Sequence, residues 1–221
     1  MRVIALGAAG LVIGAVLIAA QAPAGDRGTM SWSSRLRLLA RKDLRVTLGE
    51  LQERDGALYV ESRKLRAVAV RETPAVAELA FTYLGPTAGG AVTLASGELR
   101  RQLGLKLRAA DGCNLVYVMW RIDPVPGLVV SIKRNPGART HAECGARGYR
   151  NVRPSRAVRM GRPEAGRRYV LRADLEGQRL RVRVDGRVVW DGDLGAEAMA
   201  LEGPVGLRTD NARVSFSLRA P

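Results

Sequence analysis

Apolar and polar residues alternate with a period of two through most of this 221-residue chain. The alternating runs are short and are separated by Gly, Pro, Asn and Asp, a pattern typical of antiparallel strands that bury one face. Helical periodicity is nearly absent outside residues 196–201. The pattern therefore predicts an all-β fold, an antiparallel two-sheet sandwich, with a hydrophobic helix ahead of it at the N-terminus.

Three consecutive strands are predicted over residues 102–108, 114–123 and 128–135. One set of alternate positions in these runs is apolar and is expected to face the core, together with Trp120. The other set is largely polar and is expected to face outward. A further group of strands from residue 168 onward is joined by Gly-containing turns and is expected to bury Trp190. By contrast, residues 25–41 resemble a polar lead-in segment without a strand.

The N-terminal segment predicts export. Arg2 is followed by an apolar run from Val3 to Ala20 and then by small residues up to Ala24, which matches a secretory signal peptide. The same run is just long enough to cross a bilayer, so an uncleaved anchor over residues 3–20 is the alternative. We therefore expect a signal peptide or membrane anchor over residues 1–24, one domain over residues 25–221, and a periplasmic or extracellular (secreted) location.

The chain contains two cysteines, Cys113 and Cys144. An even number of cysteines in an exported chain predicts a disulfide. Such a bridge would close a loop of about 30 residues and stabilise the fold by about 3 to 4 kcal/mol. His141 lies nearby, but these three side chains are too few for a typical zinc site. We interpret the pair as structural.

Basic charge is high, with 36 Lys and Arg against 21 Asp and Glu, a formal net charge of +15. A charge of this size attracts anionic surfaces. Nearly all of it is arginine, a bias that a GC-rich genome also produces, so both a functional and a compositional origin stay open. Nucleic acid is disfavoured as a partner, because export separates the two and no recognition motif accompanies the charge.

The C-terminal part of the chain resembles a known superfamily. Residues 166–191 and 203–216 are similar to the last strands of concanavalin A-like lectin/glucanase sandwiches, which include 3-keto-disaccharide hydrolase-like and laminin G-like domains. Residues 113–121 are similar to the middle strand that carries an arginine on the concave face, and Arg121 is the matching residue. The resemblance implies a jelly-roll sandwich that binds saccharide on a polar concave sheet, and it implies no particular activity.

The outward positions of the three consecutive strands form the predicted binding surface. There, Tyr117 could stack on a sugar ring, while basic side chains could bind hydroxyl, carboxylate or phosphate groups. The alternative interpretation is an ordinary solvated face. The predicted ligand-binding residues are Gln102, Lys106, Arg108, Tyr117, Arg121, Ser131, Lys133 and Asn135.

Catalytic residues are not expected. Glucanases of this superfamily carry a Glu-x-Asp-x-x-Glu pattern, because retaining hydrolysis needs two neighbouring carboxylates. Glu53-Arg54-Asp55 begins this pattern, but the third carboxylate is missing. No metal or cofactor is expected either, with calcium as an open possibility. Its candidate ligands, which are also typical turn formers, are Asp185, Asp191, Asp193, Asp210 and Asn211.

A second group of basic residues lies across one predicted hairpin. Like charges on neighbouring strands destabilise a sheet unless something compensates them. We expect either an anionic ligand, or Asp174 and Asp185 on the same face, to compensate them. The arginines concerned are Arg168, Arg172, Arg179, Arg181 and Arg183.

These observations predict an exported, non-catalytic, lectin-like sandwich that binds carbohydrate or an anionic cell-envelope polymer, such as an anionic polysaccharide, through a polar, basic concave face. An association with the envelope or with a membrane surface is compatible with this function. Two alternatives stay open. One is a saccharide-acting hydrolase with an unrecognised carboxylate pair, and the other is an ancillary envelope protein that binds another protein.

Overall fold

The computed structural model describes residues 36–54 and 56–221. The predicted export segment, with its hydrophobic helix, lies outside these residues. The strands of the first sheet are β1 (Arg37–Leu39), β3 (Gln52–Arg54), β4 (Ala57–Val60), β6 (Val76–Pro86), β11 (Arg156–Ala157), β12 (Arg168–Glu176), β13 (Arg179–Val184), β14 (Arg187–Asp193) and β16 (Ala212–Ala220). Those of the second are β2 (Leu44–Leu48), β5 (Lys64–Ala69), β7 (Arg101–Leu107), β8 (Leu115–Asp123), β9 (Gly127–Lys133), β10 (Tyr149–Asn151) and β15 (Gly206–Asp210). The short helices are the 3-10 helix η2 (Arg41–Asp43), α1 (His141–Cys144) and α2 (Ala196–Met199).

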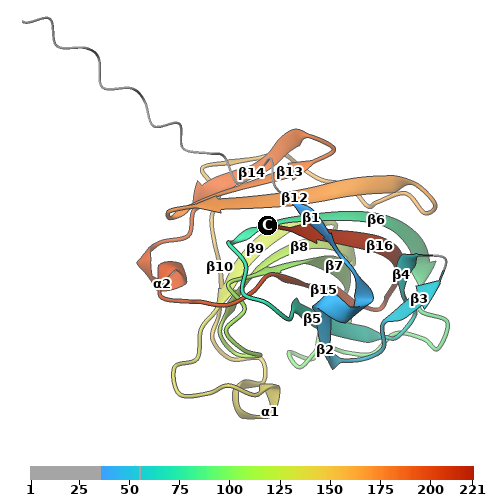
Figure 1. Ribbon diagram of the computed structural model, residues 1–221, viewed down its shortest axis with the longest axis horizontal. Helices are drawn as coiled ribbons and strands as arrows, with labels where there is room; N and C mark the ends of the chain where they lie inside the picture. Colours follow the sequence, from blue (N-terminus) through green and yellow to red (C-terminus); the bar gives the residue numbers. More distant parts are fainter. Residues whose placement is uncertain (1–35, 55) are drawn as a thin grey trace, which may run out of the picture. The chain divides into compact units, whose positions relative to one another are not determined.

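The strands form two antiparallel sheets that pack face to face, with β12 to β14 at one side and β2 and β5 at the other (Figure 1). The nine-stranded sheet has the order β11-β14-β13-β12-β6-β16-β4-β3, and β1 also pairs with β16. The seven-stranded sheet has the order β10-β9-β8-β7-β15-β5-β2. The prediction of an all-β, antiparallel two-sheet sandwich is confirmed.

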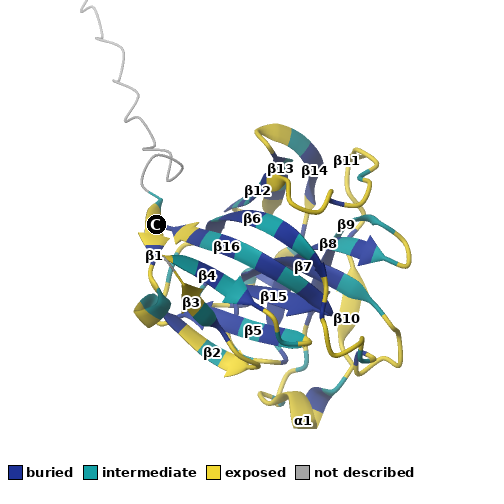
Figure 2. Ribbon diagram, turned by 90° about the vertical axis from the view of Figure 1, so that its right-hand side faces the viewer, coloured by how far each residue is buried: buried dark blue, intermediate teal, exposed yellow. Residues whose placement is uncertain are grey.

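The core follows the predicted alternation. The three leucines of β7 and the apolar alternate positions of β8 are buried between the sheets, and the strand interiors are buried while the connecting loops are exposed (Figure 2). Phe81, Trp120 and Tyr169 form an aromatic cluster in this core, with Trp120 edge-on to the other two rings at centroid distances of 5.8 and 5.2 Å. Trp190 is also buried. Both tryptophans therefore occupy the core, as predicted.

The lead-in prediction is wrong for its last residues. β1 pairs with β16, where Leu39 lies opposite Leu218 and both side chains are buried. A strand of three residues is too short to show a period of two, which explains why the sequence pattern did not reveal it.

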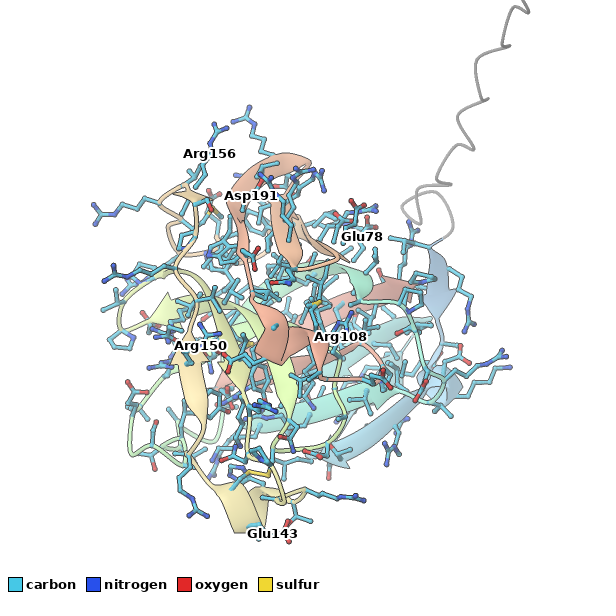
Figure 3. All side chains as sticks on the ribbon, turned by 90° about the vertical axis from the view of Figure 1, so that its left-hand side faces the viewer. Glu78, Arg108, Glu143, Arg150, Arg156 and Asp191 are labelled. Atoms are coloured by element: carbon cyan, nitrogen blue, oxygen red, sulfur yellow. A yellow bond between two sulfur atoms is a disulfide. The ribbon has the colours of Figure 1, made fainter. Side chains whose placement is uncertain are left out.

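The predicted disulfide is present. Cys113 and Cys144 are bonded, with their Cα atoms 5.9 Å apart, and both are buried. The bond joins α1 to the loop ahead of β8, near the end of the molecule where Glu143 is labelled (Figure 3). Across the described ranges, the helices are all too short or too polar to cross a membrane.

Candidate functional site

The outward positions of β7, β8 and β9 meet on the outer face of the seven-stranded sheet. Lys106, Tyr117 and Ser131 are direct cross-strand neighbours in one row. β5 and β15 add Arg66 and Arg208, which are cross-strand neighbours in the adjacent row. We call this surface the cationic face. It comprises Arg66, Gln102, Lys106, Tyr117, Ser131, Lys133, Tyr149, Arg208 and Asp210.

The cationic face is largely buried, unlike an ordinary solvated sheet face. Lys106 and Tyr117 are each 4% exposed, and Tyr149 stacks on Tyr117 with ring centroids 5.9 Å apart. The Tyr149 hydroxyl accepts a hydrogen bond from Arg208 Nη1 at 3.1 Å. Three strands separate β10 from β15 in the sheet, so this contact requires the sheet to curve strongly toward its outer side.

Two glycines permit close strand approach in this curved region. Gly104 lies opposite Arg208, and Gly206 lies opposite Lys106. A Cβ atom at either glycine would lie 2.1 Å from a carbonyl oxygen of the neighbouring strand. Neither position therefore tolerates a side chain. The side chains of Arg208 and Lys106 each have a glycine as their neighbour on the adjacent strand.

One carboxylate organises the arginines of the cationic face. Asp210 is fully buried and accepts hydrogen bonds from Arg66 Nη2 at 2.5 Å, Arg208 Nε at 2.7 Å and Gln102 Nε2 at 2.7 Å. Burial by itself would raise the pKa of Asp210, but the charges of Arg208 and Arg66 lower it to about 2. Both carboxylate oxygens are thus committed to partners within the protein.

Lys106 has no comparable partner. Its ammonium group makes no hydrogen bond or ion pair with any residue that the structure describes. Burial, together with the positive charges of Arg66, Arg208, Arg45 and Lys133, lowers the pKa of Lys106 to about 7. The four charged groups that shift this pKa most are all cations, so the amine lies in a predominantly positive environment.

Lys133 is equally buried but fully bonded. Its ammonium donates to the carbonyl oxygens of Gly112 at 3.2 Å and Gly145 at 2.9 Å, and to Cys144 Sγ at 3.0 Å. It also lies 5.1 Å from the ring centroid of Tyr149. Lys133 therefore links the two segments that the disulfide joins and packs against the Tyr149 ring.

Three predicted ligand-binding residues lie outside the cluster around Lys106. Arg108 Nη1 donates to backbone carbonyls at the end of α2, and Asn135 Nδ2 donates to backbone carbonyls of the disulfide loop. Arg121 lies at the margin of the cationic face, opposite Gln102. Its buried Nε has no hydrogen-bond partner among the described residues, and burial lowers its pKa.

The sequence analysis did not assign four residues of the cationic face to the predicted binding surface, and it named one of them, Asp210, as a candidate calcium ligand. Arg66, Arg208 and Asp210 lie in alternating runs like that of Lys106, so the same pattern carried a signal for them. Tyr149 lies in a strand of three residues that follows the disulfide-bonded segment, and its sequence context carried no comparable signal.

A second polar surface lies on the nine-stranded sheet. We call it the arginine ladder, and it comprises Arg172, Arg179, Arg181 and Arg183 with Glu78, Asp174 and Asp191. Most of these residues line a cavity of about 620 Å³. Asp191 lies toward the end of the molecule opposite Glu143 (Figure 3).

The charges of the arginine ladder compensate one another. Asp174 pairs with Arg172 at 2.9 Å and with Arg183 at 2.6 Å. Asp191 pairs with the other two arginines, at 2.8 and 3.3 Å. The expectation that Asp174 compensates these arginines is confirmed, whereas Asp185 instead accepts a hydrogen bond from the Val170 backbone N–H.

The five candidate calcium ligands have other roles in the structure. Asp191 and Asp210 bind arginines, and Asp193 accepts the backbone N–H of Gly195. Asn211 bonds to the backbone of Val92 and has a positive φ of 55°. Across residues 36–54 and 56–221, no three His, Cys, Asp or Glu side chains gather as a metal site would require.

No protein-family model matches the sequence, and no curated protein matches it. Solved structures do share its fold. The carbohydrate-binding module CBM66 from Bacillus subtilis superimposes with a TM-score of 0.55 at 15% identity, covering 79% of this chain and 91% of the module. A structure from work on endo-acting O-glycanases, which prominent members of the human gut microbiota express to initiate mucin breakdown, gives a TM-score of 0.51 at 8% identity, covering 85% and 95%. The chain thus has the concanavalin A-like, jelly-roll sandwich fold that its C-terminal strands resemble.

Proposed function

We propose that this chain is an exported, non-catalytic protein that binds carbohydrate on the cationic face. The observation that carries the proposal is Tyr149, which is 41% exposed yet is held in place by stacking on Tyr117 and by the hydrogen bond from Arg208. A fixed aromatic ring beside hydrogen-bonding side chains suits the apolar face and the hydroxyl groups of a sugar.

Two further features support the proposal. The fold is shared with a carbohydrate-binding module, although fold alone does not determine function. The disulfide is stable in the oxidising periplasm or outside the cell. A cell-envelope polysaccharide, including one at a membrane surface, is a ligand that an exported protein would meet.

The cavity at the arginine ladder is the competing location. Its guanidinium and carboxylate groups are bonded to one another, and no aromatic side chain lines it. A sugar there would have to displace ion pairs without gaining a stacking surface. We therefore place the saccharide at Tyr149.

The experiment is calorimetric titration of the full chain with neutral and anionic oligosaccharides. Replacing Tyr149→Ala should weaken binding about tenfold, because the stacking surface is lost. Tyr59→Ala, at a partly buried tyrosine of the other sheet, is the matched control and should leave affinity unchanged. A loss of binding in Arg181→Ala but not in Tyr149→Ala would move the site to the arginine ladder.

The same mixtures test whether the protein is an enzyme. Chromatography of the saccharides after prolonged incubation should show no cleavage. Turnover that disappears when one Asp or Glu is replaced would contradict the non-catalytic part of the proposal. An absence of binding across the whole panel would overturn the proposal in favour of a protein partner.

A further inference from the structure

The charges of the cationic face do not balance. Four buried or nearly buried cations, at Arg66, Lys106, Lys133 and Arg208, share the face with the carboxylate of Asp210, and the charge of a second carboxylate, Asp111, partly counters the lowered pKa of Lys133. Asp210 already binds both arginines, and Lys133 is bonded to three acceptors of the disulfide loop. Lys106 alone is left without an acceptor among the described residues. Its Nζ is not one of the fully buried side-chain atoms that lack a partner, so the ammonium still reaches the molecular surface, where an anion can contact it, while its apolar stem is buried.

Further hydrogen-bonding groups adjoin Lys106. Tyr117 lies directly opposite Lys106 in the neighbouring strand. Arg208 lies over the Tyr117 ring, with its guanidinium carbon 4.9 Å from the ring centroid. Its Nε and Nη1 bind Asp210 and Tyr149, and its Nη2 makes no hydrogen bond within the described part of the chain. Lys106, Tyr117 and Arg208 therefore lie next to one another on the cationic face.

We propose that Lys106, Arg208 and Tyr117 bind the oxyanion of an acidic saccharide, that is, its carboxylate, sulfate or phosphate group. This inference rests on the proposed function and specifies its ligand class. The oxyanion supplies the negative charge that the cationic face lacks, and charge-assisted hydrogen bonds to a lysine and an arginine are stronger than those to neutral groups. Tyr149, at the exposed edge, then contacts the sugar ring that carries the anion.

The lowered pKa of Lys106 supports this arrangement. In the free protein, burial and the surrounding cations of Arg66, Arg208, Arg45 and Lys133 lower its pKa to about 7, so the amine is partly deprotonated near neutral pH. An oxyanion beside it favours the charged form. Binding above pH 7 should therefore take up a proton.

The test compares an oligogalacturonate with its methyl ester, which replaces each carboxylate by a neutral ester and retains every ring hydroxyl. Inorganic sulfate and phosphate serve as separate probes. Titration of the full chain should show binding of the acid at least about tenfold tighter than of the ester. Lys106→Met should abolish that difference. Lys42→Met, at an exposed lysine of η2, is the matched control and should leave it unchanged.

Proton uptake provides a measurement that needs no variant. Titrations near pH 8 in two buffers of different ionisation enthalpy should show that the acid binds with net uptake of a proton. Equal affinities for acid and ester, without proton uptake, would overturn the inference and leave the proposed function standing. Binding of sulfate or phosphate that depends on Lys106, without binding of either saccharide, would keep the oxyanion site and overturn the proposed function. Binding of no probe would overturn both.

Discussion

The cationic face and the arginine ladder arise from the same sequence pattern but differ in charge balance and burial. In both, basic residues occupy alternate positions of neighbouring strands and project from the outer side of a sheet. The arginines of the ladder are partly exposed and meet three carboxylates, whereas the cationic face buries its cations around one. Partly exposed pairs that satisfy one another are close to neutral for stability. A buried excess of one charge lowers stability, and it persists where function requires it.

The largest expected loss of stability comes from replacing the carboxylates that neutralise the two surfaces. Asp210→Asn should lower the free energy of unfolding by about 3 to 5 kcal/mol, because it leaves Arg66 and Arg208 buried without their counter-charge. Asp174→Asn in the arginine ladder should cost at most about 1 kcal/mol, because its arginine partners reach solvent. Denaturant unfolding measures both values, and equal losses would show that the two surfaces do not differ as described.

Removing the disulfide should affect one surface and spare the other. Replacing both cysteines with alanine should cost about 3 to 4 kcal/mol. It also frees α1, whose Cys144 accepts a hydrogen bond from Lys133, and the segment between α1 and Tyr149. Hydrogen exchange followed by mass spectrometry should show faster exchange over residues 134–151 and unchanged protection over residues 168–193. Faster exchange in the second segment would mean that the disulfide stabilises the whole sandwich evenly.

The pH dependence of stability should come from the cationic face. Burial lowers the folded-state pKa of Lys106 to about 7 and that of Lys133 to about 8, below the ordinary lysine value of 10.5. The unfolded chain therefore binds more protons between those values and pH 10.5, so the free energy of unfolding should rise with pH in this window. Lys106 contributes at most about 1.4 kcal/mol per pH unit.

Thermal unfolding at several pH values above 7 measures this slope. Lys106→Met should reduce the slope, while Lys42→Met should preserve it. The arginine ladder adds nothing in this range, because its guanidinium and carboxylate groups do not titrate there. A stability profile that stays flat above pH 7 in the unmodified protein would contradict the burial of an unpaired lysine.

The smallest effect is expected at the edge of the arginine ladder. Arg181 is 41% exposed and makes one ion pair, with Asp191 at 3.3 Å. Arg181→Gln should change the free energy of unfolding by less than about 1 kcal/mol. Denaturant unfolding at low and high salt tests this, and a larger loss would show that the ladder is a cooperative network.

Alternation was sufficient to predict the architecture and only part of the site. It placed the leucines of β7, the outward row of Lys106 and Tyr117, and both core tryptophans correctly, because burial of one sheet face imposes a period of two. The order of strands within a sheet leaves no such local signal. β15 lies between β7 and β5, so Arg208 reaches Lys106 from about 100 residues further along the chain. The burial of Lys106 and the stacking of Tyr149 depend on the curvature of the sheet, which no single strand encodes.

The positions of β15 and β16 have a consequence for how the chain folds. Both are interior strands, one in each sheet, and they are the last two strands that the structure describes. A chain without residues 206–220 lacks an interior strand in each sheet. β5 and β7 then have no strand between them, and neither do β4 and β6. Cooperative folding of the two sheets therefore requires residues 206–220 to be present.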